Sequence, residues 1–131
     1  MKQWQVEFHE GFEPEFDDLS LAVREELLAR ALMLANFGPA LGRPAVDTLN
    51  ESKHANMKEM RFEADGGVWR VAFAFDPERK AILLVAGDKS GAGNGKRFYK
   101  QLIAKADRRF DEHLEMVKRA RDKMGKQKRK G

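Results

Sequence analysis

The sequence of 131 residues contains no cysteine, one tyrosine and four prolines. The absence of cysteine excludes a disulfide framework, a cysteine-based zinc site and a thiol nucleophile. No run of 18 apolar residues occurs, so we expect no membrane-spanning helix. The opening residues, MKQWQVEFHEGFEPEF, have no apolar core and no small-residue cleavage site. We therefore expect no secretory signal and a cytoplasmic protein.

The residues that are present suit a charged globular domain with one core. Hydrophobic residues make up 42% of the chain and charged residues 35%, and this length supports one domain better than two. The net charge of +4 is unevenly distributed. Residues 1–52 hold four basic and ten acidic side chains (−6), residues 53–116 hold thirteen and ten (+3), and residues 117–131 hold eight and one (+7). The basic part favours contacts with phosphate groups, although a solvated charged surface is the simpler alternative.

The stretch Met57–Asp76 is the clearest structural signal, because it reads as two strands joined by a tight turn. Asp65-Gly66 fits a two-residue turn with positive φ, which places Ala64 opposite Gly67 and Arg61 opposite Arg70. Since side chains alternate along a strand, one face is apolar and predicted to be core. That face holds Met60, Phe62, Trp69, Val71, Phe73 and Phe75.

The opposite face of this hairpin carries two arginines directly across from each other. Like charges in this arrangement destabilise a ladder, so the pair suggests a binding site for a polyanion. The alternative is that each arginine pairs with Glu59 or Glu63 and has no further role.

Four further elements follow from periodicity. Trp4–Phe8 alternates as a short strand, and Ser20 caps a helix over Leu21–Phe37 that ends at Gly38-Pro39. Leu27, Leu28, Ala31, Leu34 and Ala35 form its apolar stripe. The continuous apolar run Ala81–Gly87 predicts a central strand covered on both faces. Ala40–Ala55 is predicted to be a loop.

A glycine-rich segment follows that strand and imitates a phosphate-binding P-loop. The P-loop pattern requires Gly where Ser90 stands and Ser or Thr where Arg97 stands, so we reject nucleotide hydrolysis. The remaining prediction is a loop with three cations, Lys89, Lys96 and Arg97.

The last helix is predicted over Phe98–Met124. Its apolar stripe runs from Phe98 to Val117, and cations follow. We therefore expect a domain over residues 1–116 and a basic helical extension over residues 117–131. The extension, with Arg119 and Arg121, is either a phosphate-binding arm or a solvated end.

Three stretches together resemble the RelE/ParE toxin superfamily, in particular its HigB-like, phage-derived branch. They are the hairpin Met57–Phe75, the segment AILLVAGDK over Ala81–Lys89 and the helix opening KRFYKQLI. The resemblance covers about residues 1–115 in organisation. It implies an α+β fold: a small curved antiparallel sheet of about four strands, helices packed on one face and a long C-terminal helix. The other face would be open and hold the site.

The resemblance also implies a function. Members of this family are toxins of type II toxin–antitoxin systems that cut mRNA, usually on the ribosome, without a metal or other cofactor. The substrate 2′-OH attacks the neighbouring phosphorus and leaves a 2′,3′-cyclic phosphate. The implied partners are mRNA, the ribosome and a cognate antitoxin of helix-turn-helix type; a membrane is not among them.

This chemistry needs cations near the phosphorane and groups that transfer protons. Arg61 and Arg70 would clamp the phosphate, and Lys89 would reinforce them. Tyr99, His54 and Lys58 are the predicted proton-transfer or stacking residues, although Lys58 falls on the core side of its strand, and Glu59 is a weaker candidate base. Further RNA contacts are predicted at Lys53, Lys58, Lys96, Arg97, Arg119 and Arg121.

No single residue stands out as the general base, which leaves two alternatives open. One is a ParE-like toxin that acts on gyrase and lacks nuclease activity. The other is an RNA-binding module without catalysis, for which affinity would depend steeply on salt.

Overall fold

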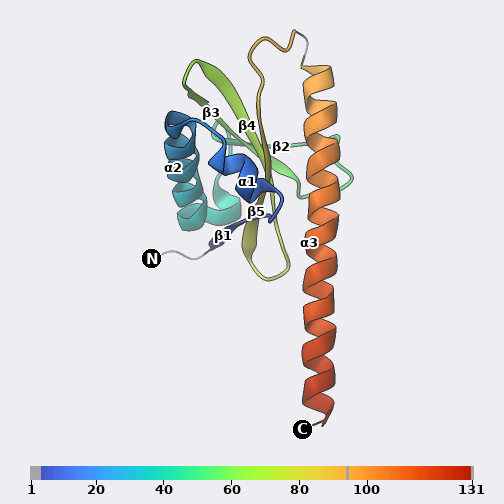
Figure 1. Cartoon of the computed structure of the whole chain (residues 1–131). Coiled ribbons are helices and arrows are strands. Elements are labelled where there is room, and N and C mark those ends of the chain that lie inside the picture. Colours follow the sequence, from blue (N-terminus) through green and yellow to red (C-terminus); the bar gives the residue numbers. More distant parts are fainter. Residues whose placement is uncertain (1–3, 94, 131) are drawn as a thin grey trace.

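The computed structural model describes residues 4–93 and 95–130 (Figure 1). Five strands form one twisted, open sheet in the order β1-β5-β4-β3-β2, with helices before and after it. The elements are β1 (Gln5–Phe8), α1 (Phe12–Asp17), α2 (Leu21–Phe37), the 3-10 helix η1 (Gly38–Ala40), β2 (Val46–Thr48), β3 (Lys58–Ala64), β4 (Gly67–Phe75), β5 (Lys80–Asp88) and α3 (Lys96–Lys130).

The predicted hairpin is present in the predicted register. β3 and β4 pair antiparallel with Arg61 opposite Arg70 and Ala64 opposite Gly67. Asp65 and Gly66 have φ of 52° and 74°, as a two-residue turn of the primed type requires. The turn therefore fixes which side chains of both strands share a face.

The sheet has one strand more than expected, and one pairing is parallel. β1 runs parallel to β5 at one edge. At the other edge, β2 pairs with β3 through only three residues, inside the segment predicted to be a loop. A strand this short carries too little alternation to be found by periodicity, so β2 could not be read from the sequence.

Helices lie on both faces of the sheet, whereas we expected one face to be open. Figure 1 shows α1 and α2 on one side and α3 on the other. Two separate cores result, one under each layer. The face that carries the arginines is the one that α3 covers in part.

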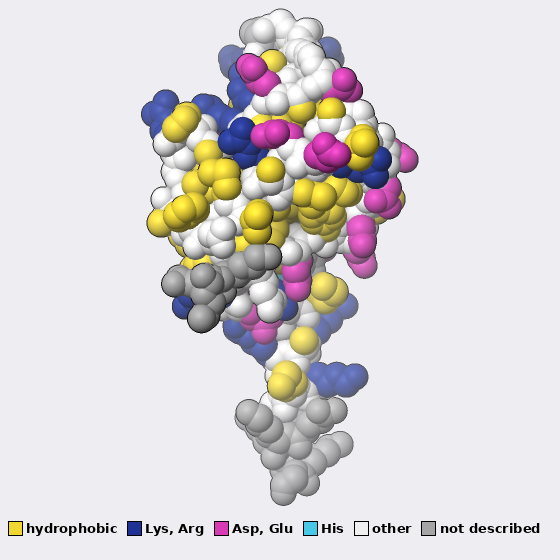
Figure 2. All heavy atoms as spheres, turned by 90° about the vertical axis from the view of Figure 1, so that its left-hand side faces the viewer, with side chains coloured by type: hydrophobic (Ala, Val, Ile, Leu, Met, Phe, Trp, Pro, Cys, Tyr) yellow, Lys and Arg dark blue, Asp and Glu magenta, His cyan; other side chains and the backbone are white. Residues whose placement is uncertain are grey.

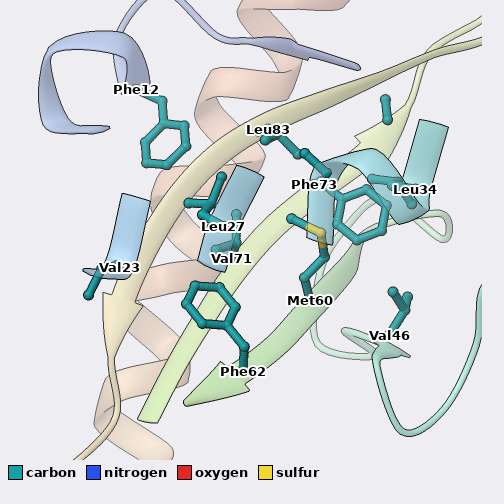
Figure 3. Packing of buried hydrophobic residues seen from close by; sticks show 12 residues of the cluster. Phe12, Val23, Leu27, Leu34, Val46, Met60, Phe62, Val71, Phe73 and Leu83 are labelled. Carbon is teal, nitrogen blue, oxygen red and sulfur yellow. The ribbon is translucent and has the colours of Figure 1, made fainter. Parts of the chain in front are cut away.

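The first core joins α1 and α2 to the sheet (Figure 3). Ser20 caps α2 as predicted, because its Oγ accepts a hydrogen bond of 3.3 Å from Val23 N. The hairpin residues Met60, Phe62, Val71 and Phe73 pack against Val23, Leu27 and Leu34 of α2. Leu28 differs from the prediction: it is 50% exposed, because it lies at the edge of the helical stripe that faces the sheet.

The second core joins α3 to β4 and β5 through the predicted stripe. It contains Ala72, Ala74, Ile82 and Leu84 of the sheet and Leu102, Ile103, Ala106 and Phe110 of α3. Val117 is the last buried residue of α3 among those whose burial is described. Beyond it α3 projects from the body of the protein (Figure 1).

A partly buried polar network, here called the α3 anchor, also holds α3 to the rest of the fold. Its members are His9, Glu15, Asp76, Arg109, Glu112 and His113. Arg109 donates two hydrogen bonds of 2.8 and 2.6 Å to the carboxylate of Glu15 in α1. It also donates one of 2.7 Å to the carbonyl of Leu84, where β5 bulges against β4. Arg109 thus satisfies a carbonyl at the irregularity of the ladder.

The other half of the α3 anchor closes the turn between β4 and β5. Asp76 Oδ1 accepts hydrogen bonds of 2.8 and 2.9 Å from the backbone N–H groups of Glu78 and Lys80. Its Oδ2 lies 2.8 Å from His113 Nε2. Both oxygens of this buried carboxylate are therefore engaged.

The face that carries α1 and α2 shows hydrophobic and acidic side chains to the solvent (Figure 2). Leu21, Leu28, Leu32 and Phe37 of α2 are exposed there. In the described part of the chain, no helix combines the length and apolarity needed to span a bilayer.

Candidate functional site

One buried carboxylate binds both arginines of the hairpin. Glu59, whose residue surface is 3% exposed, lies on the same face of β3 as Arg61. Its Oε2 lies 3.3 Å from an Nη of Arg61, and its Oε1 lies 3.5 Å from Nε of Arg70. The alternative in which each arginine pairs with a neighbouring carboxylate is thus partly confirmed, because both arginines share Glu59.

Tyr99 completes this cluster from the first turn of α3. Its hydroxyl donates a hydrogen bond of 2.8 Å to Glu59 Oε1 and accepts one of 3.2 Å from Arg70 Nε. Burial, followed by the hydrogen bond to Glu59, raises the pKa of the Tyr99 phenol. Tyr99 is therefore a neutral phenol at pH 7 that touches both a carboxylate and a guanidinium.

The two arginines differ in what they can reach. Arg61 has a side chain that is 33% exposed and also lies 3.6 Å from Asp47 Oδ2 of β2. Burial acts to lower its pKa, but the carboxylate of Glu59 and its other neighbours outweigh burial and raise it. Arg61 Nε is buried and has no hydrogen-bond partner among the described residues. Arg70 is only 13% exposed, and it donates a hydrogen bond of 3.0 Å to the carbonyl of Trp69.

This cluster lies at a groove of about 1250 Å³ between α3 and the β2–β3 edge of the sheet. One wall is the start of α3 and the loop before it, and the other is the segment that contains β2. Arg61 and Tyr99 line it, whereas Arg70 does not. The lining is Asp47, Thr48, Leu49, Asn50, Glu51, Glu59, Arg61, Lys89, Gly95, Lys96, Arg97, Tyr99, Lys100, Ile103, Ala104 and Asp107.

The three cations expected in the loop before α3 all line the groove. Lys89 Nζ lies 5.2 Å from the centre of the Tyr99 ring, a cation–π distance. A Cβ at Gly95 would approach Lys89 Cε to 3.0 Å, so glycine there leaves room for the lysine to cross to Tyr99. Lys96 and Arg97 lie on the first turn of α3, which has no acidic residue.

His54 and Lys53 lie on the loop before β3 and contact α3 further along the helix. His54 Nε2 is 2.8 Å from Asp111 Oδ1, and its ring packs edge-on against Phe110. Lys53 forms an ion pair with the same aspartate. Neither residue lines the groove.

The remaining predicted RNA contacts lie apart from the groove. Lys58 pairs with Phe73 in the ladder and so belongs to the face opposite Arg61. Arg119 and Arg121 are exposed on the projecting end of α3, and Arg119 lies 3.4 Å from Glu115. At 1.5 Å per residue, they are roughly 30 Å along the helix axis from Tyr99.

One feature of the site leaves no signal in the sequence: the wall formed by residues 47–51 depends on β2, which is too short to show alternation. Glu59 is expected from the sequence as a partner of either arginine, and the structure adds that it binds both at once. Among residues 4–93 and 95–130, no cluster of three His, Asp or Glu side chains is arranged to hold a metal ion.

Comparison with known proteins identifies relatives of this chain by sequence and by fold. Residues 14–111 match the family described as phage-derived protein Gp49-like. A candidate toxin of Mycobacterium tuberculosis (strain ATCC 25618 / H37Rv), HigB2, is 43% identical over 106 residues, or 80% of this chain and 52% of HigB2. HigB3 of the same strain, also named as a candidate toxin, is 53% identical over 82 residues, or 63% of this chain and 68% of HigB3. The chain thus spans about half the length of HigB2.

Among solved structures, the E. coli toxin RelE, determined as a double mutant in the free state, has a similar fold. The TM-score is 0.56 over 80% of this chain and 97% of RelE, with 16% sequence identity. At this identity the similarity concerns the fold alone.

Proposed function

Since this chain belongs to the Gp49-like family of phage-derived proteins, in the HigB-like branch of the RelE/ParE superfamily, we propose that it is the toxin of a type II toxin–antitoxin system and cleaves mRNA as a metal-independent endoribonuclease. The names of its relatives motivate the first part. The observation that supports the endoribonuclease activity is the cluster of Glu59, Arg61 and Tyr99, which lines a groove together with further cations.

The groove can bind the phosphate whose ester is cut. Arg61 offers a partly exposed guanidinium, which suits phosphate oxygens, and Lys89 supplies a second charge beside Tyr99. Both would stabilise the charge that accumulates on the pentacoordinate phosphorus. Arg70 acts through Tyr99 in this proposal, because it is held by that hydroxyl and does not line the groove.

Proton transfer is assigned to the pair of Tyr99 and Glu59. The phenol takes the proton of the 2′-OH as its own proton passes to the Glu59 carboxylate 2.8 Å away. The 2′-oxygen then bonds to phosphorus, the bond from phosphorus to the 5′-oxygen breaks, and the Lys89 ammonium protonates the leaving oxygen. The products are a 2′,3′-cyclic phosphate and a 5′-hydroxyl.

The proposal includes two kinds of partner. mRNA on the ribosome would enter the groove, and an antitoxin of helix-turn-helix type would block it. Because the groove contains Arg61 and several lysines, the blocking segment should carry acidic residues. Mixing the purified protein with the product of the adjacent gene and repeating the cleavage assay would test the block.

The direct test is primer extension on mRNA translated in a purified system, with and without the protein. We expect discrete 5′ ends from the native chain and mass-spectrometric evidence for cyclic phosphate on the upstream fragments. Arg61→Ala should abolish most of this cleavage. Arg108→Ala is the matched control, because Arg108 is an exposed arginine of α3 outside the groove.

Intact mRNA together with inhibited gyrase supercoiling would instead support the ParE-like alternative. Equal cleavage by the native chain and Arg61→Ala would reject the site while leaving a nuclease function in place.

A further inference from the structure

The two walls of the groove have opposite chemistry. The wall made by α3 and its preceding loop carries Lys89, Arg97 and Lys100, and the carboxylate of Asp107 on this wall already accepts hydrogen bonds from Ser52 Oγ and Lys53 N. The facing wall, residues 47–51, contributes two carboxylates and an amide. Between them the apolar side chains of Leu49 and Ile103 line the groove, and both residues are largely buried.

The four carboxylates that line the groove are not equivalent. Asp47 lies near Arg61, Glu59 holds the arginines and Tyr99, and Asp107 accepts hydrogen bonds from Ser52 Oγ and Lys53 N. Glu51 is the exception, since it has no hydrogen bond or ion pair among the described residues. Its neighbour Asn50 likewise has no polar partner among the described residues, and both are exposed on the same wall.

The difference in charge between the two walls would orient a single strand of nucleic acid in the groove. A phosphate backbone would run from Arg61 and Lys89, where the scissile phosphate is held, along the cations of α3 and away from the carboxylates of residues 47–51. The base attached to it then points toward residues 47–51. Ala104 is exposed and, with the edges of the buried Leu49 and Ile103, would provide a small apolar contact beside that base.

We propose that Glu51, with Asn50 beside it, makes this part of the groove a binding site for guanine. Guanine presents two adjacent donors, its N1–H and its 2-amino group, which match the two oxygens of one carboxylate. Adenine, cytosine and uracil each place an acceptor next to their donor on the same edge, so a carboxylate meets one favourable and one repulsive contact. The inference rests on the proposed function and specifies its substrate: single-stranded RNA with a guanine beside the scissile phosphate.

The test uses fluorescently labelled oligoadenylate ten-mers that carry 2′-fluoro groups, which prevent cleavage, with one central position varied. Anisotropy at fixed salt gives the Kd for guanine, adenine, cytosine, uracil and hypoxanthine at that position. The native chain should bind the guanine oligomer roughly tenfold more tightly than the others, within the usual discrimination of a bidentate base contact. Hypoxanthine, which lacks the 2-amino group, should lose most of this preference.

Glu51→Gln should reduce the preference for guanine to about twofold or less, because the amide keeps only one acceptor. Its Kd for the all-adenine oligomer reports the phosphate contacts separately. Glu63→Gln is the matched control, since Glu63 is an exposed glutamate of β3 outside the groove and should keep the full preference.

The outcomes test the guanine site and the nuclease proposal separately. Tight binding without a preference for guanine, or a preference that survives Glu51→Gln, overturns the guanine site and leaves the nuclease proposal standing. Failure of every oligomer to bind overturns the guanine site, and the primer-extension test on translated mRNA then decides the nuclease proposal separately. A preference for adenine that requires Asn50 would reassign the wall to a different base and also overturn the proposal.

Discussion

Two polar clusters connect α3 to the sheet, and they differ in how completely their charges are matched. In the α3 anchor, Arg109 binds Glu15 with two hydrogen bonds and the Leu84 carbonyl with a third, while Asp76 uses both oxygens. In the site cluster, one carboxylate, Glu59, serves Arg61, Arg70 and Tyr99 together. Among the described residues, no buried side-chain nitrogen or oxygen of the anchor lacks a hydrogen-bond partner, whereas Arg61 Nε of the site cluster does.

The difference shows how to separate structural from functional ion pairs when both are buried against the same helix. A saturated network contributes to stability and offers nothing to a ligand. The site cluster keeps a partly exposed Arg61, with a buried Nε that lacks a partner, at a groove lined by further cations. An incoming phosphate can supply the acceptors that the protein does not.

The largest expected effect is on catalysis at the site cluster. Tyr99→Phe removes the hydroxyl between Glu59 and Arg70 without changing the packing of the ring. We expect the cleavage rate to fall by roughly 10²–10⁴-fold, the usual contribution of a proton-transfer group. The free energy of unfolding should fall by about 1–3 kcal/mol, because two hydrogen bonds are lost and one of them satisfied the buried Glu59 carboxylate. Single-turnover cleavage and urea unfolding of the same preparation measure the two quantities.

The α3 anchor should respond in the opposite way. Asp76→Ala removes the buried carboxylate that holds His113 and two backbone N–H groups of the β4–β5 turn. We expect the free energy of unfolding to fall by about 3–5 kcal/mol, as for a buried pair that loses one partner. Cleavage per folded molecule should be unchanged. Glu78→Ala, at an exposed position in the same turn, is the control and should have little effect.

If Asp76→Ala also lowers the cleavage rate per folded molecule, the two clusters act as one unit. The proposed separation would then be wrong.

Acid should weaken the α3 anchor. The hydrogen bonds from Arg109 hold the pKa of the Glu15 carboxyl below its ordinary value of 4.5, although burial opposes them. Because the folded pKa is the lower one, this stabilisation is complete above the unfolded pKa and is lost as the pH falls through the folded pKa. Glu15→Gln should therefore cost stability at pH 7 but much less at pH 3.

The size of this effect is limited by solvent. The side chain of Glu15 is 38% exposed, so we expect a difference of about 1 kcal/mol at pH 7 rather than the value of a fully buried pair. Urea unfolding of both proteins at several pH values provides the comparison. A difference that stays constant with pH would contradict the assignment.

The hairpin could be predicted to the residue because its determinants are local. Asp65-Gly66 sets the turn, and alternation then fixes every partner up to Met60 and Val71. The helix over Leu21–Phe37 was predicted with the observed bounds for the same reason, since its cap and its stop lie next to it. Arg61 and Tyr99 were named from the sequence, and the structure brings them to one groove.

The rest depends on packing between distant segments, which leaves no local signal. Contacts between residues about thirty positions apart place α3 over the arginine face and leave Arg70 outside the groove lining. The buried roles of Arg109 and His113 were missed because both look like ordinary surface positions of a charged helix until Glu15 and Asp76 are placed beside them. Residues 50 and 51 became candidates only once β2 placed them across from α3.

The smallest expected effect concerns the projecting end of α3, which belongs to neither cluster. Arg119 and Arg121 are exposed, so replacing both with alanine should change the free energy of unfolding by no more than about 0.5 kcal/mol. If both contact phosphates, the slope of log K against log salt for single-stranded RNA should become shallower by about 1.4, because each contact contributes about 0.7. The double variant Arg24→Ala and Arg30→Ala, on α2, removes the same charge from the opposite layer and should leave the slope unchanged. Equal slopes in all three proteins would show that the basic extension is a solvated end and that the groove alone binds the backbone.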